Sequence, residues 1–214
     1  MTEGLRAPPA DGDMEGLRRA VDRLQEALVR STGRALFVSR ALPEGARLQG
    51  RFEVRDCRGK VKRLQDAALP LPLPLFWLVT QAGAPSELIR IEAAGGRIAL
   101  WPAADLIELQ VGYRWHGFTG RQMPDWDGRF VVFAEDEGEP LALRLDEDNG
   151  PVWSAPRSDG RYDFSVRSPS LADFLTQLAE AVEAGAAACL PQSPEFSALS
   201  QEPPERSVPK KRGS

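Results

Sequence analysis

Apolar residues recur at spacings of three and four at both ends of the patterned part of the chain. The first stripe comprises Met14, Leu17, Val21, Leu24 and Leu28. It predicts an amphipathic helix from about Asp13 to Ser31, with Asp13 as its N-cap and Gly33 as its stop. We expect this helix to pack on its own domain, although a partner-binding or dimerising helix has the same pattern.

The second stripe lies near the C-terminal end, at Leu171, Phe174, Leu175, Leu178 and Val182. Ser170 and Asp173 precede and open this stripe at the spacing of a capping box, in which a side chain satisfies a free backbone N–H at the start of a helix. The pattern therefore predicts a closing helix that begins after Ser170.

Between the two helices the apolar pattern shortens to the length of strands. Residues 35–42 and 47–54 are strand candidates, with a polar turn at 55–60. Residues 69–83, LPLPLPLFWLVTQAG, predict a proline-led entry into a short helix that ends at Gly83. Residues 88–92 and 97–101 flank the turn AAGG and predict a hairpin. Residues 102–110 predict another short helix with Leu106 and Leu109 inward.

A strand meander follows at residues 129–134, 140–145 and 150–155, with acidic turns at 135–139 and 146–149. Leu141, Leu143 and Leu145 alternate with other residues and so share one face of their strand. The first strand, RFVVFA, is almost continuously apolar, which is typical of a strand covered on both faces. We expect it to be central in an antiparallel sheet.

Composition supports a folded core, because 42% of the 214 residues are apolar and five are Trp and nine Phe. We divide the chain into a flexible N-terminus (1–13), an N-terminal helix and strand extension (14–68), a main domain (69–186) and a disordered tail (189–214). The longest apolar run, residues 69–79, is shorter than the ~20 residues that span a bilayer. No signal-peptide core opens the chain, and Cys57 and Cys189 do not suggest a disulfide. We expect a cytoplasmic protein without a membrane partner.

Charge is distributed unevenly along the chain. Residues 1–65 carry fourteen Lys or Arg and nine Asp or Glu, whereas residues 125–163 carry eleven Asp or Glu and four Arg, a net charge of −7. The basic residues between Arg47 and Lys60 are accompanied by one aromatic residue, Phe52, and by no nucleic-acid motif. We interpret them as a solvated strand face and expect no nucleic-acid partner.

The sequence has no set of residues that predicts catalysis, a metal site or a cofactor. The single histidine, His116, has no nucleophile motif near it, and one histidine with two distant cysteines does not form a zinc pattern. A calcium loop counted from Asp146 fails, because its fifth and twelfth positions are Gly150 and Arg157. The Asp-Trp-Asp at 125–127 has no nucleotide-binding unit before it.

The acidic turns allow two interpretations. Asp, Glu, Asn and Gly are ordinary turn residues, so turn chemistry alone explains them. Alternatively, they form a negative surface that attracts a cationic protein partner, with nearby aromatic residues as anchors. The candidate contact residues for that second interpretation are Tyr113, Trp115, Asp125, Trp126, Asp127, Glu135, Asp136, Glu137, Asp146, Glu147, Asp148, Trp153, Asp159 and Tyr162.

Several segments occur in an order that resembles a known family. They are LPLPLFWLVTQAG, RIALWPAADLIELQVGYRW, WDGRFVVFAEDEGEPLALRLDEDNGPVWSAP and SPSLADFLTQL, within residues 69–182. In order and spacing they resemble the SUKH superfamily, which includes bacterial toxin-immunity proteins and a fungal regulator of cell-wall synthesis. One departure is the segment 156–162, PRSDGRY, where related sequences often have a His-Gly pair and a Trp.

The resemblance implies an α+β fold in which a mostly antiparallel mixed sheet is flanked by helices. It also implies a binding protein without catalysis, which acts as an immunity protein by binding a secreted toxin directly. The alternative is a regulatory or scaffolding module for cell-wall or secretion machinery. On the first hypothesis the partner is a cognate toxin with a basic surface.

Overall fold

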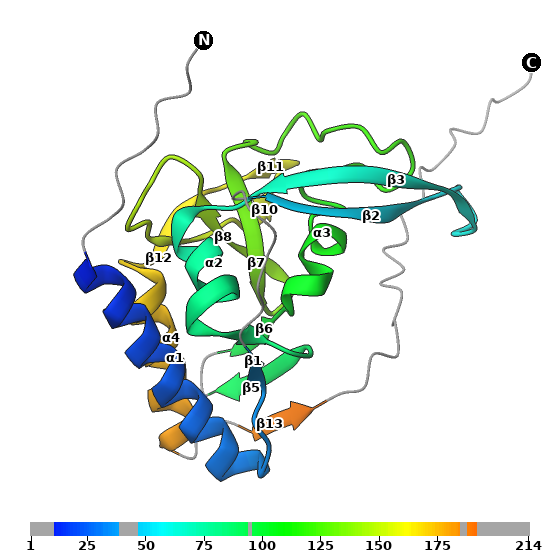
Figure 1. Cartoon of the computed structure of the whole chain (residues 1–214). Coiled ribbons are helices and arrows are strands. Elements are labelled where there is room, and N and C mark those ends of the chain that lie inside the picture. The colour runs from blue at the N-terminus through cyan, green and yellow to red at the C-terminus, as the bar shows by residue number, and fades with distance from the viewer. Residues whose placement is uncertain (1–10, 39–46, 94–95, 185–187, 192–214) are drawn as a thin grey trace, which may run out of the picture.

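In the part of the chain that the structure describes, seven antiparallel strands form the central sheet (Figure 1). The computed structural model describes residues 11–38, 47–93, 96–184 and 188–191. In spatial order the strands are β12 (Ser165–Ser168), β9 (Val152–Ser154), β8 (Glu139–Arg144), β7 (Phe130–Asp136), β6 (Gly96–Leu100), β5 (Ile89–Ala93) and β13 (Ala188–Pro191). Each neighbouring pair in this sheet is antiparallel, which corrects the expectation of a mixed sheet.

The predicted meander and its central strand are confirmed. Strand β7 occupies the middle position of the sheet, and its residues 130–134 are all buried. In β8, Leu141 and Leu143 are fully buried, but so is Ala142 between them. The alternation therefore identified the strand correctly, although both of its faces are covered.

In the described residues the α-helices are α1 (Asp11–Thr32), α2 (Leu73–Trp77), α3 (Leu106–Leu109) and α4 (Leu171–Glu183). Helix α2 continues as a π-helical turn, Leu78–Ala82, and Gly83 ends it with a φ of 109°. The capping box is confirmed, because the Asp173 N–H donates to Ser170 Oγ at 3.0 Å. All five residues of the predicted stripe of α4 are buried.

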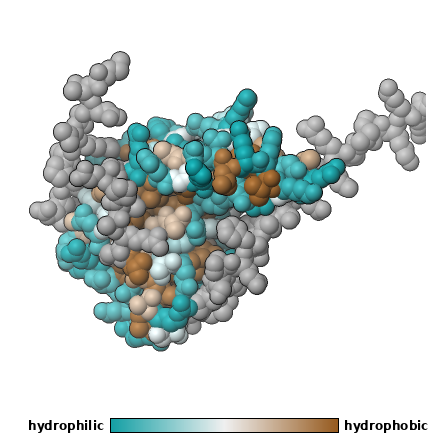
Figure 2. Space-filling model, turned by 45° about the vertical axis from the view of Figure 1, so that its right-hand side comes forward, coloured by the Kyte–Doolittle hydropathy of each residue, from teal (hydrophilic) through white to brown (hydrophobic). Residues whose placement is uncertain are grey.

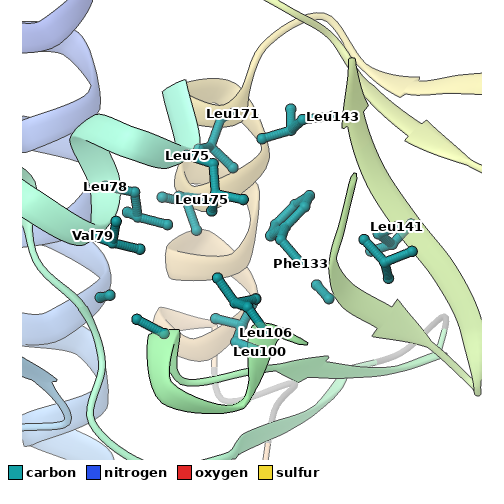
Figure 3. Close-up of a cluster of buried hydrophobic side chains, with 14 of the residues drawn as sticks. Leu75, Leu78, Val79, Leu100, Leu106, Phe133, Leu141, Leu143, Leu171 and Leu175 are labelled. Carbon is teal, nitrogen blue, oxygen red and sulfur yellow. The ribbon is translucent and has the colours of Figure 1, made fainter. Parts of the chain in front are cut away.

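The core lies between α4, the α2 segment and the sheet. Figure 3 shows Leu75, Leu78 and Val79 of the α2 segment facing Leu171 and Leu175 of α4, with Phe133 of β7 beside them. The rings of Phe133 and Phe174 meet edge to face, with centroids 5.9 Å apart. This packing joins the closing helix to the central strand.

Helix α1 lies alongside α4 (Figure 1) and packs on its own domain, as expected. Its Leu24 and Leu28 are fully buried. On the solvent side, Arg23 forms ion pairs with Glu183 at 2.7 Å and with Glu180 at 3.1 Å. The helix begins at Asp11, so Asp13 lies inside it and is not the N-cap.

Strands β2 (Arg47–Arg55) and β3 (Val61–Pro70) form a hairpin that projects from the body of the molecule (Figure 1). Strand β3 was not predicted, and the boundary expected between residues 68 and 69 lies within it. Buried side chains from both sides of that boundary belong to one core cluster. In this hairpin, called the arm below, Val61 is 52% exposed and Leu64 is 56% exposed. Figure 2 shows brown apolar patches among teal atoms at the upper right of the molecule.

The remaining elements are short. Strand β1 (Phe37–Val38) pairs with β4 (Ala84–Pro85), and β10 (Arg157–Ser158) pairs with β11 (Arg161–Tyr162). Residues 11–13 are helical and residues 189–191 lie in β13, which corrects the flexible and disordered assignments there; residues 1–10 and 192–214 lie outside the described part. Among the residues that the structure describes, no helix is long and apolar enough to cross a membrane.

Candidate functional site

The two acidic turns of the meander lie at opposite ends of β8. Residues 135–139 precede and open this strand, whereas residues 146–149 follow it. Six residues of strand at about 3.4 Å each separate the two turns by roughly 20 Å. The predicted contact surface is therefore divided between two ends of the sheet and does not form one acidic face.

At the end near residue 146, arginines of the same segment neutralise much of the acidic charge. Arg144 pairs with Asp146 at 2.6 Å and with Glu147 at 2.7 Å. Arg129 pairs with Asp127 at 2.6 Å. The hydrogen bonds from these arginines hold the pKa of Asp127 and of Asp146 below the usual range of an aspartate.

Trp153 also belongs to this end of the sheet. Its indole N–H donates to Glu147 Oε2 at 3.2 Å, and its ring meets Phe130 edge to face. Its neighbour Val152 is fully buried, whereas Trp153 is half-buried. Asp148 lies in the same loop.

At the other end, the three consecutive acids point to different surroundings. Glu135 contacts Tyr113 and Trp101, whereas Asp136 pairs with Arg167 at 3.6 Å. Glu137 is exposed and has a φ of 52°, which a tight turn requires. Only Glu135 therefore contributes to a concave surface.

That surface is a cleft with a volume of about 710 Å³. The segment 109–123, the β7–β8 turn and the β10–β11 hairpin surround it. Its aromatic and ionisable lining comprises Trp101, Tyr113, His116, Phe118, Glu135, Glu139, Arg157 and Tyr162. The volume is within the range of roughly 300–1,000 Å³ that ligand pockets have.

Gln110 fixes one wall of this cleft. Its side chain is fully buried, and its amide nitrogen donates to the Val132 carbonyl at 2.7 Å and to the Leu106 carbonyl at 2.9 Å. Its amide oxygen accepts from the Val132 N–H at 3.1 Å. Because β6 ends at Leu100, opposite Ala134, Gln110 takes the place of a neighbouring strand along this part of β7. Tyr113 is thereby held over the end of β7.

Glu135 is the half-buried carboxylate of the cleft. Its Oε1 accepts from the Tyr113 hydroxyl at 2.8 Å, and its Oε2 accepts from the Trp101 indole N–H at 3.3 Å. Burial raises the pKa of Glu135, although these two donors and the charge of Arg90 oppose the shift. Burial and the charge of Glu135 also raise the pKa of Tyr113, so its hydroxyl keeps its proton and remains a donor at neutral pH.

Tyr162 lies beside Tyr113 in the lining of the cleft, and the two rings meet edge to face with centroids 6.4 Å apart. The Tyr162 hydroxyl donates to the Gly112 carbonyl at 3.1 Å, and the guanidinium of Arg157 lies 5.5 Å from the Tyr162 ring centroid. Arg157 also donates to Asp125 at 3.4 Å. Asp159, at the β10–β11 turn, has a φ of 49°.

Two of the predicted aromatic anchors support the structure. Trp126 is only 3% exposed, meets Tyr162 edge to face at 4.9 Å and donates to the Phe130 carbonyl, so the expectation that it is an exposed anchor is wrong. Trp115 is half-buried and stacks on Phe52 of β2, with centroids 5.0 Å apart. It links the projecting hairpin to the segment that lines the cleft.

The structure thus brings together Tyr113, Glu135 and Tyr162 from the predicted set, and Asp125 through its bond to Arg157. The sequence did not single out Trp101, Phe118, Met123 or Glu139, which also line the cleft. Trp101 directly follows β6, whereas the sequence pattern assigned it to the last position of the predicted strand 97–101.

Glu135 and Glu139 both belong to the turn end of the β7–β8 hairpin, and both line the cleft. Within the described ranges, no three His, Cys, Asp or Glu side chains are grouped so that they could hold a metal ion. Comparisons with models of protein families, with curated proteins and with solved structures each found no match to this chain.

Proposed function

We propose that this chain is a non-catalytic binding protein of the SUKH type, an immunity protein that neutralises a secreted bacterial toxin by binding it in the cytoplasm. The observation that carries the proposal is the open cleft, where apolar rings and a carboxylate face the same space. Aromatic side chains at a concave surface are typical of the residues that dominate binding energy in protein interfaces.

The fold supports the proposal at the level of its class. An antiparallel sheet covered by helices, with the closing helix after the last strand of the meander, agrees with the α+β fold that the resemblance implies. The predicted segments also follow one another in the expected order: the α2 turn, the β5–β6 hairpin, α3, the meander and α4.

The cleft also suggests the chemistry of the partner. Phe118 and Glu139 both line the cleft, where Phe118 is 53% exposed and Glu139 is exposed. A basic toxin surface with one apolar side chain at its centre is complementary to this combination, because opposite charges raise the association rate and buried rings slow dissociation.

The test is direct binding to the product of a toxin gene adjacent to the gene for this chain. We expect Phe118→Ala to weaken binding at least about tenfold, which corresponds to about 1.4 kcal/mol. Val166→Ala is the matched control, because Val166 is 55% exposed but lies on β12 outside the cleft. The proposal fails if no such toxin binds or if both variants weaken binding equally.

The projecting arm favours a second candidate, a regulatory or scaffolding module. Residues 47–70 carry seven Lys or Arg and three Asp or Glu, and Val61 and Leu64 are exposed among them. A scaffold needs two contact surfaces, and the arm offers one that is separate from the cleft. Partner binding that survives Phe118→Ala but is lost with Leu64→Ser would favour this candidate, as would a housekeeping gene neighbourhood.

A further inference from the structure

The carboxylate of Glu135 has unused hydrogen-bonding capacity inside the cleft. A carboxylate accepts about four hydrogen bonds through its two oxygens. The Tyr113 hydroxyl and the Trp101 indole supply one to each oxygen, and both donors are uncharged. These donors and the charge of Arg90 compensate burial of the carboxylate only in part, because the pKa of Glu135 stays raised. The site therefore favours a cation that reaches the remaining lone pairs.

The other ionisable groups around the cleft leave its balance negative. Glu139 adds a second carboxylate at the rim. Arg157 is already engaged by Asp125 and by the ring of Tyr162. His116 Nδ1 accepts from the Phe118 N–H at 3.1 Å. Arg90 lies on β5, and its positive charge favours the charged form of Glu135 on β7.

The walls of the cleft are suited to a flat cation. Trp101, Tyr113 and Tyr162 present aromatic rings, which attract cations through their negative faces. The Arg157 guanidinium over Tyr162 shows that such a contact forms in this cleft. A guanidinium can bond a carboxylate through two parallel N–H groups and stack on a ring at the same time, whereas an ammonium bonds as a point charge.

We propose that Glu135, with the rings of Tyr113 and Tyr162, forms a pocket for one arginine side chain of the partner protein. This inference rests on the proposed function, since it names the group of the partner that the cleft receives. The arginine completes the hydrogen bonds of Glu135 and lies against the rings of Tyr113 and Tyr162, which meet edge to face with centroids 6.4 Å apart. It neutralises a carboxylate that burial otherwise penalises.

The pocket can be tested without the partner by titrating the chain with butylguanidinium chloride. The indole N–H of Trp101 reports on the pocket by NMR, because it donates to Glu135. Trp153 provides an internal control, because its indole donates to Glu147 at the other end of the sheet. We expect a saturable shift of the Trp101 resonance, with a dissociation constant on the order of 1 mM, and no comparable shift of Trp153.

Butylurea has the same shape without the charge and is the matched control ligand. We expect it to bind at least about tenfold more weakly than butylguanidinium, and we expect Glu135→Gln to remove the difference between the two. Tyr162→Leu is a second variant, which leaves Glu135 in place and should weaken butylguanidinium severalfold. Equal shifts with both ligands, or binding that is unchanged in both variants, would overturn the pocket.

Two further arms separate this inference from the proposed function. Spermidine tests a free polyamine as the occupant, and binding of spermidine far tighter than butylguanidinium would overturn the assignment to a partner arginine. If butylguanidinium does not bind while Phe118→Ala still weakens the toxin complex, the pocket is wrong and the proposed function stands. If butylguanidinium binds but no toxin does, the pocket stands and the proposed function fails, because the arginine does not come from a toxin.

Discussion

Replacement of Gln110 by leucine tests how the cleft is held in place. Leucine is close to glutamine in size, but it can neither donate to the Val132 carbonyl nor accept from the Val132 N–H. In the native chain the two contacts measure 2.7 Å and 3.1 Å, and Gln110 is fully buried. The substitution therefore leaves two backbone groups of the central strand without their partner.

The expected cost follows from those two groups. A buried polar group that loses its hydrogen bond costs about 1–3 kcal/mol, and the apolar side chain regains part of this, so we expect Gln110→Leu to lower the free energy of unfolding by about 2–5 kcal/mol. Domains have a total stability of about 5–15 kcal/mol, so the loss is large.

Urea denaturation followed by tryptophan fluorescence measures this loss. Gln49→Leu is the control, because Gln49 is exposed on the arm, and its effect should stay within about 0.5 kcal/mol. The Trp101 indole resonance should also move in Gln110→Leu, since Tyr113 and Glu135 lose their fixed geometry. An unfolding midpoint equal to that of the native chain would refute the reasoning.

If Gln110→Leu does not fold, Gln110→Glu keeps the test decisive. A protonated carboxyl at this position can both donate and accept, whereas the ionised form cannot donate and is buried with a charge. Its pKa should therefore be raised in the folded state, and stability should be highest at low pH and fall as the pH rises through that pKa. A pH-independent stability difference from the native chain would contradict this.

The remaining predictions concern the cleft carboxylate and the helices. Because burial raises the pKa of Glu135 above 4.5, the native chain should lose stability as the pH rises from about 4.5 through the raised pKa. Glu135→Gln should reduce this loss of stability with rising pH, measured by urea denaturation from pH 4 to 8. An unchanged pH dependence of the stability would show that another group causes it. Ser170→Ala removes the cap of α4 and should cost about 0.5–2 kcal/mol, with Ser170→Gly costing less, as measured by thermal unfolding. Leu24→Ala should cost about 2–5 kcal/mol, whereas Val29→Ala, at a position 38% exposed, should cost far less; a similar small loss for both would mean that α1 does not share the core.

The elements with a regular apolar pattern were predictable from sequence. The stripes of α1 and α4 and the apolar strand β7 bury the residues that their periodicity indicates, except that Met14 of α1 is only partly buried. The Ser170 cap and the Gly83 stop depend on local backbone geometry, so neighbouring residues determine them. At these positions, the structure that the local sequence favours is also the one that buries the apolar residues.

The elements without such a pattern were not predictable. Strand β3 is mostly exposed and lacks a regular apolar alternation, because it pairs only with β2 in a projecting hairpin and covers little core. Strand β13 lies in a segment whose composition resembles a tail, and its pairing with β5 depends on residues about a hundred positions away. Strand pairing of this kind depends on which edge is free, which local sequence does not encode.

The sequence by itself determined which residues are acidic and aromatic, and in which order they occur. Only the tertiary structure decided that Asp127, Asp146 and Glu147 meet arginines, that Trp126 is buried, and that Tyr113, Glu135 and Tyr162 share one cleft. The physical reason is that charge and ring character belong to single residues, whereas pairing, burial and concavity arise between segments that the fold brings together.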